Sequence, residues 1–183
     1  MTKYIILLLL IGGHFAAGAC SCNPHKNLHA SRKYELKHAD LIFIGKVTPI
    51  PENHPSSPAD WGKSPIFKVV VTEQFKGVNV GDTLSGILSS SCSINPTAGL
   101  WLIYAEVNDQ GLISISSCGL SRAFYQPERI FYDQYSIRPP TIAELENPQP
   151  NDDLDWAIAL ANIKLQAAKD LKEEVLWLRT KRR

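Results

Sequence analysis

The sequence lacks the features of a nucleic-acid-binding or membrane-spanning protein. Its 183 residues include 19 basic and 18 acidic residues, so there is no excess of either charge. A balanced charge offers no electrostatic footprint for nucleic acid or anionic lipid. After residue 20, no apolar run approaches the ~18 residues that a bilayer-spanning helix needs. We therefore expect neither nucleic acid as a partner nor a transmembrane segment in the mature chain.

Catalytic motifs are missing as well. The chain has no nucleophile elbow, no phosphate-binding loop and no paired-histidine zinc motif. Asp152, Asp153 and Asp155 are explained by the start of a helix, whose first turn favours acidic side chains. The sequence therefore predicts a protein that is not an enzyme and that has no cofactor or metal of its own.

The N-terminus has the pattern of a signal peptide. Lys3 precedes an apolar run over residues 4–11, and Ala17 and Ala19 form the small-residue pattern that signal peptidase recognises. Cleavage would leave Cys20 as the first of 164 residues, enough for one domain and an appendage. We expect a secreted or periplasmic protein. A lipid anchor on Cys20 is the alternative, although lipoprotein signals usually place Leu where this chain has Ala17.

All four cysteines lie in the exported part of the chain. An even number behind a signal peptide predicts two disulfides formed in an oxidising compartment. Cys20 and Cys22 are separated by one residue, so a bond between them would be strained. Each of them is expected to pair with either Cys92 or Cys118. Two such bonds would hold a terminus that normally frays.

Five segments have the composition of β-strands, and they predict a mainly β fold. We expect strands at residues 40–47, 66–75, 83–89, 99–107 and 112–117, with a short helix within residues 23–40. Five strands with two long excursions favour a small closed or partly open barrel, whose closure removes exposed strand edges.

The chain changes character after Cys118. Residues 121–150 are rich in aromatics and proline and predict an irregular connector. Residues 151–183 predict a long amphipathic α-helix, because apolar residues recur at spacings of three and four. This helix is expected to pack along the barrel or to form a homodimer. The recurring residues are Leu154, Ile158, Ala161, Leu165, Ala168, Leu171, Val175 and Leu178.

Five short motifs carry a resemblance to a known family. They are Cys20-Ser21-Cys22-Asn23-Pro24 after the signal peptide, Ala39 to Val47, Phe75-Lys76-Gly77, Ser91-Cys92 and Ser117-Cys118. Over residues 20–120 the chain resembles the N-terminal netrin-like domain of the tissue inhibitors of metalloproteinases. The resemblance implies a five-stranded Greek-key barrel of the oligonucleotide/oligosaccharide-binding type. A third disulfide and a cysteine-rich C-terminal subdomain are missing, and this short form looks like a bacterial relative.

The resemblance also implies a function and a site. It implies disulfides Cys20–Cys92 and Cys22–Cys118, and a secreted inhibitor of zinc metalloendopeptidases. The amine and carbonyl of Cys20 form a bidentate ligand for the target's catalytic zinc, which keeps one position open for water. Ser21 would enter the neighbouring specificity pocket. The protease-contacting residues would be Ser21, Cys22, Asn23, Pro24, Ser90, Ser91 and Ser93.

Two other interpretations of the same residues remain. One is a non-inhibitory netrin-like module, or an envelope lipoprotein, that holds another protein through the barrel or the helix. The other is a metal site formed by Cys20, Cys22, His25 and His29, whose thiolates and imidazoles are typical zinc ligands.

Overall fold

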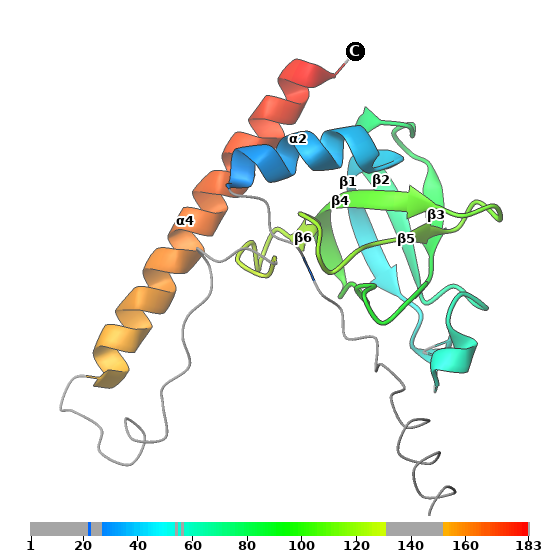
Figure 1. Ribbon diagram of the computed structural model, residues 1–183, viewed down its shortest axis with the longest axis horizontal. Coiled ribbons are helices and arrows are strands. Elements are labelled where there is room, and N and C mark those ends of the chain that lie inside the picture. The colour runs from blue at the N-terminus through cyan, green and yellow to red at the C-terminus, as the bar shows by residue number, and fades with distance from the viewer. Residues whose placement is uncertain (1–21, 23–26, 54, 56, 131–151, 183) are drawn as a thin grey trace, which may run out of the picture.

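The computed structural model describes residue 22, residues 27–53, residue 55, residues 57–130 and residues 152–182. Figure 1 shows a β-barrel with one short and one long helix beside it. The predicted signal peptide and most of the predicted connector lie outside the described residues. The elements are α2 (Leu28–His38), β1 (Leu41–Pro49), η1 (Pro51–Asn53), η2 (Pro58–Asp60), β2 (Phe67–Lys76), β3 (Thr83–Gly86), β4 (Gly99–Val107), β5 (Ile113–Ser114), β6 (Arg122–Ala123) and α4 (Asp152–Lys181).

Five strands close into a barrel. β1 pairs antiparallel with both β2 and β4, β2 pairs with β3, and β5 joins β3 in parallel and β4 antiparallel. The short strand β6 pairs antiparallel with β4 at Leu102, on the edge of β4 that faces away from β1. The predicted mainly β fold, with a five-stranded barrel and a long C-terminal helix, is confirmed. β3 and β5 are shorter than predicted, because residues beyond them leave the regular ladder and enter loops.

Strands β1 and β4 are buried on both faces. Phe43 and Ile103 point into the barrel core, whereas Ile42, Ile44 and Leu102 belong to a second apolar cluster that also contains residues of both helices. A strand covered on both faces has a nearly continuous apolar sequence instead of an alternating one. Such a long apolar run is easy to recognise as a strand from sequence. The outer faces of β1 and β4 are also where both helices dock.

The residues that flank helix α2 define its two ends. The Asn27 side chain accepts a hydrogen bond from the backbone N–H of Ala30 (2.9 Å) and caps the helix N-terminus. Ala39, in extended conformation, ends it. Only Leu28 and Arg32 are buried, so the weak periodicity of this segment reflects a helix that rests on the barrel by few side chains.

Helix α4 contacts the rest of the protein through its C-terminal half. Ala167, Leu171 and Leu178 are buried, whereas Leu154 and Leu165, from the same predicted stripe, are more than half exposed. The predicted stripe recurs slightly more often than every 3.6 residues, so it drifts around the helix and leaves the packed face. The prediction of a helix packed along the barrel therefore holds only for the C-terminal half of α4.

Candidate functional site

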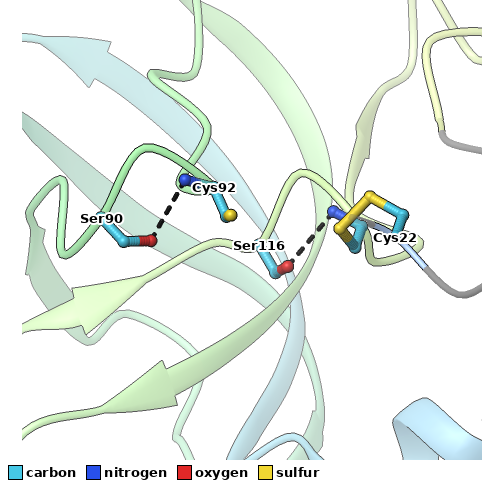
Figure 2. Close-up of a disulfide and its surroundings, with 5 residues drawn as sticks. Cys22, Ser90, Cys92 and Ser116 are labelled. Atoms are coloured by element: carbon cyan, nitrogen blue, oxygen red, sulfur yellow. Dashed lines mark hydrogen bonds between the residues drawn. A yellow bond between two sulfur atoms is a disulfide. The ribbon is translucent and has the colours of Figure 1, made fainter. Parts of the chain in front are cut away.

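A disulfide attaches the predicted N-terminal segment to the barrel. Cys22 is bonded to Cys118, with their Cα atoms 5.2 Å apart and a sequence separation of 96 residues. Cys118 lies in a turn after β5, where its backbone N–H donates to the Ser116 hydroxyl (3.2 Å; Figure 2). Closing a loop of this length removes about 4–5 kcal/mol of chain entropy from the unfolded state. This bond is one of the two that the resemblance implies.

The serine-rich loop before Cys92 is held by its own side chains. The Ser93 hydroxyl accepts from the backbone N–H groups of Ser89 (3.1 Å) and Ser90 (3.2 Å). The Ser90 hydroxyl accepts from the N–H of Cys92 (3.1 Å; Figure 2). Short side chains that bond to nearby backbone groups stabilise turns in this way. The predicted contact residues Ser90, Ser91 and Ser93 therefore lie together on one fixed loop.

The two cysteine-bearing loops are hydrogen-bonded to each other. The backbone N–H of Ser117 donates to the carbonyl of Cys92 (2.7 Å), and Ser93 forms a β-bridge with Ser116. Cys92 is itself disulfide-bonded. We call residues 89–93, residues 116–118 and Cys22 the cystine edge. Both cysteines that would clamp the N-terminus thus lie side by side at this edge.

Four of the predicted site residues lie outside the described part of the chain. They are Cys20, Ser21, Asn23 and Pro24. The structure brings together Cys22, Ser90, Ser91, Cys92 and Ser93. Cys20, the residue predicted to bind the target's zinc, is not among the described residues.

A pocket of about 410 Å³ adjoins the cystine edge, and no sequence pattern predicted it. Trp101 lines the pocket, and its indole N–H donates to the carbonyl of Thr97 (2.9 Å). Ser117 of the cystine edge lines the pocket, and Arg129 contributes the cationic side chain. The pocket is lined by Ile94, Asn95, Thr97, Trp101, Ser117, Ala123, Gln126, Arg129 and Ile130.

A buried charge cluster joins both helices to the barrel. Glu174 of α4 is fully buried and accepts from Arg122 Nη2 (2.8 Å) and from Arg32 Nε (3.2 Å). The Tyr104 hydroxyl donates to Glu174 Oε1 (2.6 Å). Burial and the neighbouring Glu174 carboxylate raise the pKa of Tyr104 well above 10, so this hydroxyl keeps its proton. No sequence pattern predicted this cluster, although Glu174 lies beside Val175 of the predicted stripe and three residues after Leu171.

Glu35 of α2 connects this cluster to the turn that carries Cys118. Burial, followed by the nearby Glu174 carboxylate, raises the pKa of Glu35 from 4.5 to about 7. A Cβ atom at Gly119 would lie 2.9 Å from Glu35 Oε1, so the carboxyl group packs against this turn. Near neutral pH, the residue is therefore partly protonated.

The structure excludes the alternative interpretation of Cys20, Cys22, His25 and His29 as one metal site. Cys22 is bonded to Cys118 and has no thiolate to offer. His29 is exposed on α2, and His25 lies outside the described residues. In the described part of the chain, no group of three or more His, Cys, Asp or Glu side chains is placed to hold a metal ion. Nor does any helix described there have the length and apolar character to cross a membrane.

Comparisons with known protein families, with curated proteins and with solved structures gave no match to this chain. The fold and the site define it as a small closed-barrel protein with disulfides at one edge.

Proposed function

We propose that this protein is a secreted inhibitor of zinc metalloendopeptidases that acts through its N-terminus. The observation that supports the proposal is the cystine edge, where the Cys22–Cys118 bond and the disulfide-bonded Cys92 lie on adjoining loops. A segment attached at such an edge is restrained before it meets a partner. Little conformational entropy is then lost on docking, which favours tight binding.

The proposed chemistry uses the first residue of the processed chain. The α-amino group of Cys20 has an ordinary pKa near 8, so a useful fraction is neutral at pH 7–8. With its own carbonyl oxygen it would displace the water on the target's zinc, which holds the open coordination position. Ser21 would occupy the adjacent pocket of the enzyme, and Ser90, Ser91 and Ser93 would contact the rim of its cleft.

Titration of the processed protein against a panel of zinc endopeptidases tests this function. We expect loss of activity against at least one enzyme. Acetylating the N-terminal amine, or adding one alanine before Cys20, should weaken that inhibition by at least 100-fold. An alanine added after Arg183 is the control and should have no effect. Equal inhibition by both extended chains would show that the amine does not bind the zinc.

A second arm tests the restraint. The double variant Cys22→Ser/Cys118→Ser keeps the amine but removes one attachment. We expect weaker inhibition together with a loss of about 2–5 kcal/mol in the free energy of unfolding. Unchanged inhibition by this variant would remove the cystine edge from the mechanism.

A non-inhibitory binding module is the second candidate, because α4 presents apolar side chains to solvent. Leu154, Trp156 and Ile158 are each about half exposed or more. Large exposed apolar patches usually mark interaction sites. Under this alternative, no enzyme of the panel is inhibited, whereas substitutions on α4 abolish association with the partner.

A further inference from the structure

The pocket beside the cystine edge has an apolar side that is formed by the barrel core. Trp101 and Ala123 belong to that core, and Ile94 packs against it. Trp101 and Ala123 are also cross-strand partners in β4 and β6, and an alanine beside a tryptophan leaves space that a larger side chain would fill. The volume of about 410 Å³ lies near the lower end of the roughly 300–1,000 Å³ of ligand pockets. It suits a single ring or amino-acid residue better than a large cofactor.

Hydrogen bonds hold the residues around this pocket in place. The indole of Trp101 is fixed by the bond from its N–H to the carbonyl of Thr97 (2.9 Å). In the segment after β6, the backbone N–H of Gln126 donates to the carbonyl of Ala123 (3.2 Å), and that of Arg129 donates to the carbonyl of Gln126 (3.1 Å). The pocket is therefore formed before a ligand arrives, and little conformational entropy is lost on binding.

Three polar side chains of the pocket have bonding capacity to spare. Arg129 and Asn95 are exposed, and Gln126 is half-buried. Among the described residues, no hydrogen bond or ion pair ties any of these three side chains, and no Asp or Glu lines the pocket. The guanidinium of Arg129 thus has no counterion there, while each amide offers both a donor and an acceptor. A pocket with an apolar side and a few convergent polar groups is typical of a binding site.

We propose that this pocket binds the carboxyl-terminal residue of a polypeptide, where that residue has an apolar side chain. Arginine suits a carboxylate because its planar guanidinium can bond both oxygens at once. The amides of Asn95 and Gln126 match the N–H and C=O groups of the last peptide bond. The apolar side chain lies against Trp101 and Ile94, which removes its surface from water. A residue inside a chain, or an amidated end, has no carboxylate for Arg129.

NMR titration of the ¹⁵N-labelled protein, with its disulfides intact, tests the proposal. The probes are N-acetyl-Ala-Phe, the same dipeptide with a C-terminal amide, and 3-phenylpropanoate, which has the ring and the carboxylate but no peptide bond. We expect N-acetyl-Ala-Phe to shift the indole N–H signal of Trp101, with a dissociation constant of about 0.1–1 mM for a ligand of this size. The amide should bind about 10-fold more weakly, and 3-phenylpropanoate several-fold more weakly.

Three results of this titration would overturn the proposal. The first is an indole signal of Trp101 that does not move with N-acetyl-Ala-Phe. The second is equal affinity for the acid and its amide, which would show that no carboxylate is recognised. The third is 3-phenylpropanoate binding as tightly as the dipeptide, which would make the ligand a small apolar acid and not the end of a chain.

Substitutions identify the groups that bind. Arg129→Gln should weaken binding of the acid about 10-fold and leave binding of the amide unchanged, because only the acid uses the guanidinium. Arg182→Gln, at an exposed arginine after α4 that does not line this pocket, is the matched control and should bind both probes normally. Ile94→Ala should weaken both probes by the same factor. A preference for the acid that survives Arg129→Gln, or that Arg182→Gln also removes, would contradict the assigned role of Arg129.

This inference does not rest on the proposed inhibition. The pocket shares only Ser117 with the cystine edge. A parent chain that inhibits no protease should therefore bind N-acetyl-Ala-Phe equally well, and Arg129→Gln should keep whatever inhibition the parent chain shows.

Discussion

At the scale of single residues, the buried carboxylate of Glu174 joins parts of the chain that are far apart in sequence. It bonds Arg32 of α2, Arg122 of β6 and Tyr104 of β4. A buried charge is costly unless it is paired and hydrogen-bonded. Each partner of this cluster therefore depends on the carboxylate, which makes Glu174 the residue that fixes how α4 sits on the barrel.

Removing this carboxylate should destabilise the fold strongly. Glu174→Ala leaves Arg122, whose side chain is fully buried, without its counterion. We expect a loss of about 3–5 kcal/mol in the free energy of unfolding. Urea unfolding measures this. Glu173→Ala, at the exposed neighbouring position, is the control and should stay within about 0.5 kcal/mol of the parent. Similar midpoints for the two variants would contradict the role given to Glu174.

The raised pKa of Glu35 predicts how stability depends on pH. Its pKa is about 7 in the folded protein against 4.5 as an ordinary glutamate, so the folded state binds the proton more tightly. The contribution of Glu35 is therefore most favourable below pH 4.5 and is lost as pH rises from 4.5 to about 7. Glu35→Gln should be the more stable form at pH 8, by up to about 3 kcal/mol, and should differ little from the parent at pH 4.

Unfolding of the parent and the variant at both pH values checks the Glu35 prediction. Glu52→Gln, at an exposed carboxyl in η1, serves as the control. A gain at pH 8 that is matched at pH 4, or that Glu52→Gln reproduces, would show that titration of Glu35 is not the cause.

At the scale of elements, the sequence predicted the barrel well and the helix contacts poorly. β1 and β4 were easy to predict as strands, because both faces of each strand are buried and each sequence is a long apolar run. The stripe of α4 was recognised, but its drift out of the packed face was not. Periodicity shows that a helix has an apolar face, but not where along its length the neighbouring element ends.

The buried charge cluster and the pocket could not be predicted from the sequence, for a different reason. Glu174 and Arg122 are 52 residues apart, and charged side chains are ordinarily exposed. Their pairing follows from the docking of α4 on the sheet, which no local pattern records. The sequence predicts Trp101 to be a strand residue. Only the fold shows that it also lines a pocket beside the cystine edge.

At the scale of the whole molecule, the barrel holds the loops of the cystine edge in one arrangement. The loops that carry Cys92 and Cys118 leave different strands and meet through backbone hydrogen bonds. Cys22 joins them by its disulfide, and α2 packs Glu35 against the same turn. The apolar side chains that α4 exposes belong to other residues and lie apart from this edge.

The chemical state of the mature N-terminus tests the central claim most directly. Intact-mass and N-terminal peptide measurements on the exported protein should show a chain that begins at Cys20 with an unmodified α-amino group and no free thiol. An acylated or diacylglyceryl Cys20, or a chain that begins at another residue, would contradict zinc chelation by the N-terminus.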